Sequence, residues 1–354
     1  MRRLVLLILA FSITVSPVTV AAQKGTFPEM KQIQGPQNPR LGFVIHGGAG
    51  VIKKGALTPE QEKEYRSKLE EAVMAGYSAL QAGKTSIEAV EIAIRLLEDS
   101  PLFNAGKGAV FNAEGKNELD ASIMDGKTLM AGAVAGAHHV KNPISLARAI
   151  MEKSPHVMMI GDGAEQFAKE QKIELVDEKY FFTQRRWDEL QQEKKSEKVK
   201  PALAAIPISG VISPPAAHFG TVGAVALDKF GNIAAGTSTG GMTNKKYGRV
   251  GDSPIIGAGT FANNNSCGVS ATGWGEYFIR VGVARDIASL MEYRALPIQQ
   301  AADMVMKKVQ NLGGDGGVIA MDKWGNIGIS FNTEGMYRAY INSEGRPVVL
   351  IYGN

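Results

Sequence analysis

The first half of the chain combines a buried-strand pattern with two helical patterns. Residues 42–46 form an apolar run that leads into His46 and four small residues, which predicts a strand ending in a glycine-rich turn. Apolar positions then recur at helical spacing in two neighbouring segments, residues 58–81 and 85–97. Each segment begins with the spacing of a capping box. The capping pairs are Thr58 with Gln61 and Thr85 with Glu88.

Shorter patterns follow. Residues 119–126 and 130–140 predict two strands with a turn at Asp125-Gly126, and residues 144–151 predict a short helix. From residue 185 to residue 200 the chain is strongly charged, and several prolines come next. We interpret residues 185–220 as a mobile surface segment and not as an element of the fold.

The C-terminal part contains an internal similarity. Residues 226–233 resemble residues 320–327, and each segment has a strand, an Asp-x-x-Gly-Asn turn and a second strand. Two similar hairpins in neighbouring sheets would explain this, and so would two independent hairpins with favoured turn residues. Neither segment shows βαβ alternation, so the sequence disfavours a doubly wound parallel sheet.

The N-terminus and the composition restrict the class of protein. Residues 1–22 have a basic start, a short apolar run and small residues at their end, which predicts a secretory signal peptide and a periplasmic or secreted protein; a membrane anchor is the alternative. The hydrophobic fraction of 44% and the net charge of +4 are typical of a globular protein. We expect no nucleic-acid partner, and no membrane partner once the signal is removed. Cys267, the only cysteine, excludes an internal disulfide.

Several common catalytic sites are absent from the sequence. The five histidines lack the spacing of metal ligands. There is no phosphate-binding glycine loop before Lys-Ser/Thr and no Gly-x-Ser-x-Gly motif.

The pair Gly220-Thr221 directly precedes an apolar strand pattern and follows the charged segment. This arrangement suits a chain that is cut between the two residues and then works from a new N-terminus. The α-amine of an N-terminal threonine has a pKa of about 7.7–8.0, so it can accept the hydroxyl proton near neutral pH. An ordinary inter-domain linker is the alternative explanation for the charged segment.

Three further clusters could support such a nucleophile. Thr239 ends the strand that pairs with the Thr221 strand, and taken by itself it is explained more simply as a turn-capping threonine. Arg249 and Asp252 offer the two charges that bind an amino-acid head group, or they form a surface ion pair. The turn at residues 271–276 precedes a helical pattern, and it either presents backbone N–H groups to an oxyanion or simply caps the helix.

Together these clusters closely resemble the plant-type L-asparaginase/isoaspartyl peptidase family of N-terminal nucleophile hydrolases. The resemblance covers nearly the whole chain after the predicted signal peptide. The matching motifs are residues 46–50, 101–111, 118–121, 154–158, 220–221, 248–254 and 332–338.

The resemblance implies a role for each candidate residue. Thr221 resembles the nucleophile freed by self-cleavage at Gly220–Thr221, and Thr239 resembles its supporting threonine. Thr272 and Gly273 resemble the oxyanion-stabilising pair, which Asn104 assists. The implied substrate contacts are Arg249, Val250, Gly251, Asp252, Thr272, Gly273, Trp274 and Gly275. A structural sodium ion would bind the backbone carbonyls of Leu97, Glu98, Ser100, Phe103, Ala105 and Lys107. No cofactor is implied for the chemistry.

The same resemblance implies an α+β fold, a four-layer αββα sandwich of the N-terminal nucleophile hydrolase type. An α-subunit of residues 23–220 and a β-subunit of residues 221–354 would form one catalytic domain and assemble with a second copy as (αβ)₂. The implied function is hydrolysis of β-aspartyl dipeptides and L-asparagine. Trp274 departs from the smaller residue common in relatives, and we expect its ring to affect the leaving-group side.

Three alternatives remain at this stage. A glycosylasparaginase would typically carry Asp before the nucleophile, where this chain has Gly220. A threonine aspartase would carry serine at the position of Thr239 and a long insertion. An exported amino-acid-binding protein would use Arg249 and Asp252 without catalysis and would remain one intact chain.

Overall fold

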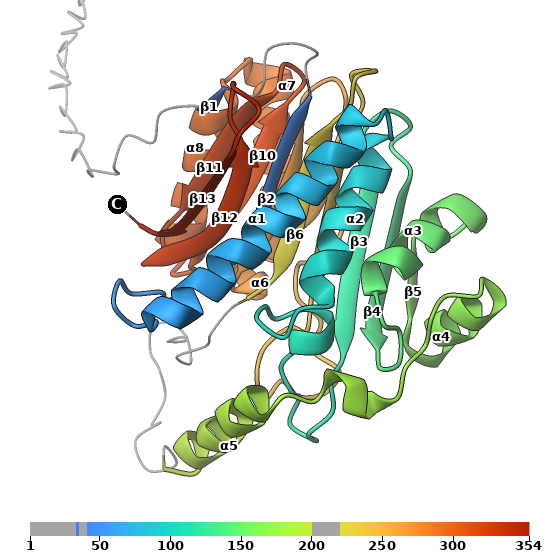
Figure 1. Cartoon of the computed structure of the whole chain (residues 1–354), viewed down its shortest axis with the longest axis vertical. Helices are drawn as coiled ribbons and strands as arrows, with labels where there is room; N and C mark the ends of the chain where they lie inside the picture. The colour runs from blue at the N-terminus through green and yellow to red at the C-terminus, as the bar shows by residue number, and fades with distance from the viewer. Residues whose placement is uncertain (1–32, 35–40, 200–219, 354) are drawn as a thin grey trace, which may run out of the picture.

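The computed structural model describes residues 33–34, 41–199 and 220–353, and it has two β-sheets that lie against each other (Figure 1). This mixed structure belongs to the α+β class. The predicted signal peptide and the residues that directly precede Gly220 lie outside the described residues.

The larger sheet has the strand order β13-β12-β2-β6-β7-β3-β4-β5, and all its neighbours are antiparallel except β4 and β5. Its strands are β2 (Gly42–Gly50), β3 (Leu119–Asp125), β4 (Ala131–Ala137), β5 (Met158–Ile160), β6 (Val222–Leu227), β7 (Ile233–Thr239), β12 (Gly335–Ile341) and β13 (Pro347–Tyr352). The helices α1 (Pro59–Gln81), α2 (Ser86–Glu98) and α3 (Pro143–Lys153) pack on this sheet.

The smaller sheet has the order β1-β11-β10-β9-β8 and is antiparallel. Its strands are β1 (Ile33–Gln34), β8 (Thr260–Ala262), β9 (Cys267–Gly273), β10 (Gly316–Asp322) and β11 (Asn326–Phe331). The helices α7 (Val283–Arg294) and α8 (Ile298–Asn311) pack on it, and α6 (Gly275–Val281) lies beside both helices. The remaining elements are α4 (Gly161–Glu170), α5 (Gln184–Val199), η1 (Gly106–Gly108) and η2 (Glu178–Phe181).

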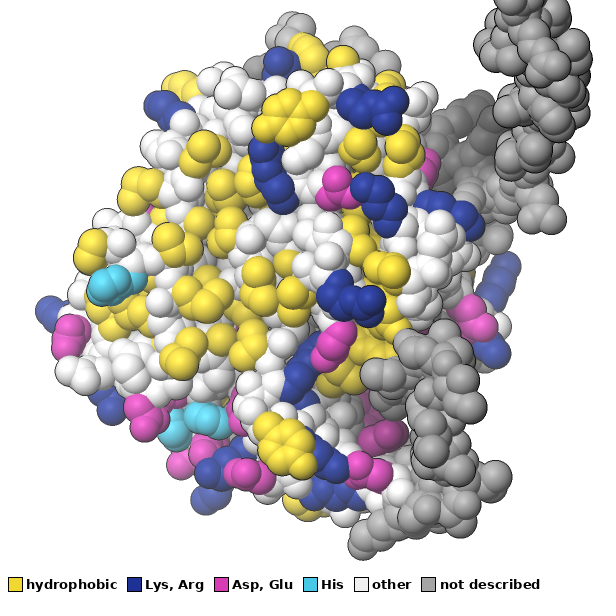
Figure 2. All heavy atoms as spheres, turned by 180° about the vertical axis from the view of Figure 1, so that it is seen from behind, with side chains coloured by type: hydrophobic (Ala, Val, Ile, Leu, Met, Phe, Trp, Pro, Cys, Tyr) yellow, Lys and Arg dark blue, Asp and Glu magenta, His cyan; other side chains and the backbone are white. Residues whose placement is uncertain are grey.

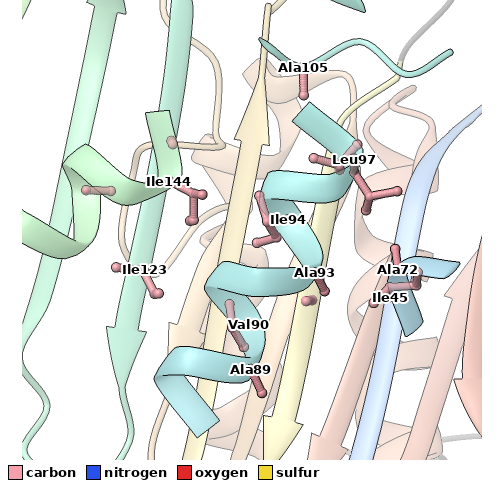
Figure 3. Packing of buried hydrophobic residues seen from close by; sticks show 14 of the residues in the cluster. Ile45, Ala72, Ala89, Val90, Ala93, Ile94, Leu97, Ala105, Ile123 and Ile144 are labelled. Atoms are coloured by element: carbon pink, nitrogen blue, oxygen red, sulfur yellow. The ribbon is translucent and has the colours of Figure 1, made fainter. Parts of the chain in front are cut away.

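Capping residues and apolar faces explain the first two helices. Both predicted capping boxes are present, and Pro59 occupies the first helical turn of α1. One face of α2 carries Val90, Ile94 and Leu97 into the core above the larger sheet (Figure 3). Truncating a buried side chain such as Ile94 to alanine costs about 2–5 kcal/mol.

Both predicted hairpins are confirmed, and they lie in different sheets. β6 and β7 pair in the larger sheet, whereas β10 and β11 pair in the smaller sheet. Each turn is organised by an aspartate, Asp228 or Asp322, whose carboxylate accepts two backbone N–H groups.

The interpretation of residues 185–199 as a mobile segment is wrong, because they belong to helix α5 (Gln184–Val199). Arg186 is buried and donates to the Gly108 carbonyl at 2.8 Å. Leu190, one turn later, is also buried, and Trp187 packs edge-on against Phe111. Only a few apolar residues of α5 face the rest of the protein, and they are surrounded in the sequence by charged residues. They are too few to give a clear helical pattern.

Within the described ranges, no helix is both long and apolar enough to cross a membrane.

Candidate active site

Thr221 lies at the start of β6, next to the end of β7. The register pairs Val222 with Ser238, and the Thr221 hydroxyl donates to the Thr239 hydroxyl at 3.1 Å. Both threonines are buried. Gly223 faces Ser270 of the smaller sheet, and side chains alternate along a strand, so Thr221 also faces the space between the sheets. The prediction that the hairpin brings Thr239 beside Thr221 is confirmed.

The Gly220–Thr221 peptide is closely packed on both sides. Gly48 has φ of +110°, and a Cβ there would lie 2.6 Å from the Gly220 Cα. A Cβ on Gly220 would lie 3.1 Å from the Asn104 Cβ. The His46 Nδ1–H donates to the Thr221 carbonyl at 3.0 Å. The backbone around this peptide therefore requires glycine at position 48.

Asn104 supports the turn that follows β7. Its Nδ2 donates to the Gly241 carbonyl at 2.7 Å, and its Oδ1 accepts the Val110 N–H at 2.9 Å. The side chain is fully buried beside Gly220. These bonds fix the amide next to the candidate nucleophile.

Arg249 and Asp252 lie together, and Glu276 of α6 binds the arginine. The Glu276 carboxylate accepts from Arg249 Nε and Nη2, each at 2.8 Å. Asp252 is buried, and its Oδ2 has no partner among the described residues. Burial raises the pKa of Asp252 to about 7, although Arg249 acts in the opposite direction. A buried carboxylate with a free oxygen is suited to bind a ligand's ammonium group.

Glycines let the backbone approach these charges closely. A Cβ on Gly275 would lie 2.9 Å from both Arg249 Nη2 and Asp252 Oδ1, and a Cβ on Gly251 would lie 2.8 Å from Arg249 Nη1. Val250 lies between Arg249 and Asp252 in the sequence and is 37% exposed. The backbone at positions 251 and 275 thus approaches the charged pair closely.

Thr272 and Gly273 end β9 opposite β2. The Thr272 hydroxyl accepts the Ala49 N–H at 3.4 Å, which joins the ends of the two strands. Gly273 has φ of +155°, and a Cβ there would lie 2.5 Å from the Asp315 carbonyl oxygen. The glycine is therefore required where the strand turns into α6.

The ring of Trp274 lies in the core. It is 5% exposed and packs against Tyr277, with ring centroids 4.9 Å apart. Its backbone N–H donates to the Asp315 carbonyl. The ring is therefore largely enclosed by protein, and its effect on the leaving-group side stays a prediction.

A buried chain of hydroxyl groups also reaches the candidate nucleophile. From His46 Nε2 it runs through Ser270, Thr237, Thr260 and Ser122 to the Ser253 carbonyl, with steps of 2.9, 2.7, 2.5, 2.8 and 2.6 Å. Burial lowers the pKa of His46 to about 3, so its ring is neutral near pH 7. Ser253 follows Asp252, so the chain connects the nucleophile's backbone to the charged loop.

The sequence alone assigns no role to this series of hydroxyl groups or to Glu276. The sequence does contain a hint of it. Polar residues stand within four buried strands, at His46, Ser122, Thr237 and Ser270. Their mutual contacts depend on how the two sheets face each other, which a single sequence does not show.

The segment proposed for sodium joins the end of α2 to η1. A Cβ on Gly106 would lie 2.4 Å from the Glu98 carbonyl oxygen, and a Cβ on Gly108 would lie 2.0 Å from the Phe103 carbonyl oxygen. Glycine is therefore required at both positions, because each lies against a backbone carbonyl. The Glu98 carboxyl is buried beneath it, and burial raises its pKa to about 8. No cluster of three or more His, Cys, Asp or Glu suitable for a metal occurs among the described residues.

Known proteins are similar to this chain over most of its length. Residues 39–351 match the model of the family described as asparaginase. An isoaspartyl peptidase of Salmonella typhimurium is 50% identical over 311 residues, covering 88% of this chain and 98% of that protein. An isoaspartyl peptidase/L-asparaginase of Xenopus laevis is 40% identical and covers 88% of this chain and 95% of its own length. A plant-type L-asparaginase of Pyrococcus abyssi is 41% identical, with 85% and 96% covered. The chain therefore belongs to the asparaginase family.

Proposed function

We propose that this protein is a self-cleaving hydrolase of β-aspartyl dipeptides and L-asparagine. The observation that carries the proposal is the Thr221–Thr239 hydroxyl pair, buried beside the start of β6. The hydroxyl chain from His46 links the Thr221 backbone to Ser253, the neighbour of Asp252, whose Oδ2 has no partner among the described residues. The names of the family relatives support the same substrate class.

The proposed reaction uses the freed amine of Thr221 as its base. Thr221 Oγ attacks the side-chain carbonyl carbon of the substrate, and the amine accepts the hydroxyl proton. The Gly273 N–H and the Thr272 hydroxyl stabilise the oxyanion. The C–N bond then breaks, the protonated amine returns its proton to the leaving nitrogen, and an aspartyl ester remains on Thr221. Water hydrolyses this ester and releases aspartate.

The substrate head group would bind to Arg249 and Asp252. Glu276 holds one edge of the guanidinium through Nε and Nη2, and this leaves Nη1 to face the substrate α-carboxylate. Asp252 Oδ2 would pair with the α-ammonium. A free α-amino acid head group is thereby selected, which restricts cleavage to aspartyl residues linked through the side chain.

Self-cleavage at Gly220–Thr221 would generate the subunits of residues 23–220 and 221–354. The close packing of Gly48 and Asn104 around Gly220 supports this proposal, because it fixes the peptide beside the Thr221 hydroxyl. In the uncut chain the Thr221 nitrogen is an amide and cannot serve as a base. The cut is therefore a requirement of the mechanism.

The deciding experiment compares the wild type with Thr221→Ala by intact mass and by hydrolysis of β-aspartyl-leucine. We expect two fragments and activity for the wild type, and one folded, inactive chain for the variant, with a loss of about 10⁴-fold or more. Thr333→Ala, a threonine outside the site, is the matched control. An uncut wild-type chain with full activity would disprove the mechanism.

The proposal extends to the arrangement of the layers and to the assembly of the subunits. We infer a four-layer αββα sandwich from the helices that pack on each sheet. We also infer an (αβ)₂ assembly, because exposed apolar residues gather near the β5 edge of the larger sheet, and Figure 2 shows hydrophobic side chains on the rear face. The exposed residues are Leu129, Met130, Val157, Met158 and Ile160. Light scattering of wild type and Ile160→Lys tests this assembly.

Two further expectations depend on the family resemblance. A sodium ion held by the backbone carbonyls between Leu97 and Lys107 stays a prediction. Export through residues 1–22 stays a prediction. The comparisons favour neither the glycosylasparaginase nor the non-catalytic binding protein.

A further inference from the structure

An aromatic pocket opens next to the Gly220–Thr221 peptide. Its volume is about 290 Å³, and Gly220, Asn104 and Gly47 form its wall toward the candidate nucleophile. On the other side, the Tyr65 and Tyr337 rings are stacked with centroids 4.5 Å apart, and Phe103 packs edge-on against Tyr65. These rings belong to the helix-covered face of the larger sheet. The pocket therefore lies on the helix-covered side of the larger sheet, and neither Arg249 nor Asp252 lines it.

Arg185 of α5 places a positive charge at this pocket. Its guanidinium donates to the Tyr65 hydroxyl at 2.7 Å and to the carbonyls of Pro101 and Leu102 at 3.0 and 2.9 Å. These acceptors are all neutral. The neighbouring Arg186 differs, because it forms an ion pair with Glu189 at 2.8 Å. Arg185 thus keeps an uncompensated charge for an anionic ligand.

The chemistry of the leaving group points to the same pocket. The Thr221 amine that receives the hydroxyl proton must return it to the leaving nitrogen when the C–N bond breaks. The leaving nitrogen must therefore lie within hydrogen-bond distance of the Thr221 nitrogen. In the uncut chain, that nitrogen is bonded to Gly220, which lines the pocket. The leaving residue thus extends into the space beside Gly220.

We propose that this pocket is the subsite for the leaving residue of the substrate. It takes an amino acid with an aromatic or large aliphatic side chain, and Arg185 binds the free α-carboxylate of that residue. This inference rests on the proposed function. It assigns leaving-group selectivity to Arg185 and the three aromatic rings, and Trp274 does not line this pocket.

The test uses three substrates: β-aspartyl-phenylalanine, its C-terminal amide and L-asparagine. We expect the wild type to have a higher kcat/KM for the dipeptide than for the amide. Arg185→Met lowers the dipeptide-to-amide ratio about threefold to tenfold, since one charged hydrogen bond is lost at an exposed site. Arg185→Lys restores part of the ratio. Arg66→Met is the matched control, because Arg66 follows Tyr65 but does not line the pocket.

A second measurement separates this inference from the proposed function. Ligand-observed NMR follows the binding of free phenylalanine, the product, to wild type and Arg185→Met. Binding only to the wild type supports the subsite even if no substrate is hydrolysed, which would refute the proposed function alone. Equal loss of kcat/KM on all three substrates would overturn the subsite, because Arg185 would then act only by supporting the Pro101–Leu102 backbone.

Discussion

The hairpins β6–β7 and β10–β11 have nearly the same turn but different open ends. Gly231 and Gly325 adopt φ of +79° and +81°, and the preceding aspartates bind the same backbone positions. In the alignment of Asp228 with Asp322, Thr221 corresponds to Asp315. The Thr221 hydroxyl meets Thr239, whereas the Asp315 carbonyl accepts the Trp274 N–H.

The two hairpins share one type of structure but contribute differently to the candidate site. The first hairpin supplies the candidate nucleophile, and the second supports the turn at Thr272–Gly273 through the pairing of Gly316 with Gly273. The turns carry the sequence similarity, and the open ends carry the chemistry. Substitutions at the open ends should therefore affect activity, and those at the turns should affect stability.

Gly316→Ala should give the largest effect of these substitutions. Gly316 has φ of +147°, and its Cβ would lie 2.4 Å from the Thr272 carbonyl oxygen. Displacement of the oxyanion turn should lower kcat about 10²- to 10³-fold. Gly231→Ala, at a turn with open space around it, should keep its activity and cost about 1–2 kcal/mol of unfolding free energy. Kinetics and thermal unfolding of both variants check this; similar losses of activity would contradict the division.

Thr239→Val should lower kcat about 10²-fold while the fold is retained. Valine keeps the shape of threonine but removes the oxygen that accepts the Thr221 hydroxyl and the Gly241 N–H. The equivalent threonine of the second hairpin is Thr333, whose hydroxyl donates to the Gly335 carbonyl at 2.9 Å. Thr333→Val should have near wild-type kinetics. If both variants lose activity equally, Thr239 has no special role.

The KM for β-aspartyl dipeptides should fall as pH rises toward about 7. Burial raises the pKa of Asp252 to about 7, so below that pH the carboxyl is neutral and cannot pair with an ammonium group. Below pH 7, KM should fall about tenfold for each unit of rising pH, because one proton is released when the substrate binds. Asp252→Asn should bind weakly at every pH. KM measured from pH 5 to 8 decides this; an equal slope in Asp252→Asn would assign the proton elsewhere.

The raised pKa of Asp252 also affects stability, and here the effect of rising pH is unfavourable. Its pKa is higher in the folded protein than in the unfolded chain, so the folded state binds the proton more tightly. Its contribution to the unfolding free energy is therefore present at low pH and is lost as pH rises from about 4 to about 7. Urea unfolding of wild type and Asp252→Asn over this range measures the difference.

Thr260→Val should have the smallest effect, a fall in kcat/KM of about threefold to tenfold. The substitution breaks the hydroxyl chain between His46 and Ser253. Ser122 and Thr237 each lose one hydrogen-bond partner. Thr260→Ser keeps the hydroxyl and should restore most of the loss. The second hairpin has Phe331 where the first has Thr237, so it contains no such chain. Equal kinetics of both variants would show that the hydroxyl is not needed.

Local signals predicted much of the fold. The capping boxes at Thr58 and Thr85 and the aspartate turns at Asp228 and Asp322 depend on residues a few positions apart, and the structure agrees with each. The charged stretch of α5 was misjudged because its docking depends on Gly108 and Phe111, which are distant in sequence.

In the candidate site, too, the local contacts were predicted from the sequence and the long-range contacts were not. The Thr221–Thr239 contact follows from hairpin register and was predicted from the sequence. The Glu276–Arg249 pair and the pocket beside Gly220 were not predicted. They require the relative placement of α6, α5 and the two sheets, and no short sequence pattern encodes that placement.

The strand order of the larger sheet has a consequence for the two fragments that a cut at Gly220–Thr221 would leave. Strands from the two sides of the cut alternate in space, and the pairs β12–β2, β2–β6 and β7–β3 each join one fragment to the other. Dissociation would expose three ladders of unpaired backbone groups in the middle of a sheet. The fragments should therefore stay together at any dilution, and each should need the other during folding.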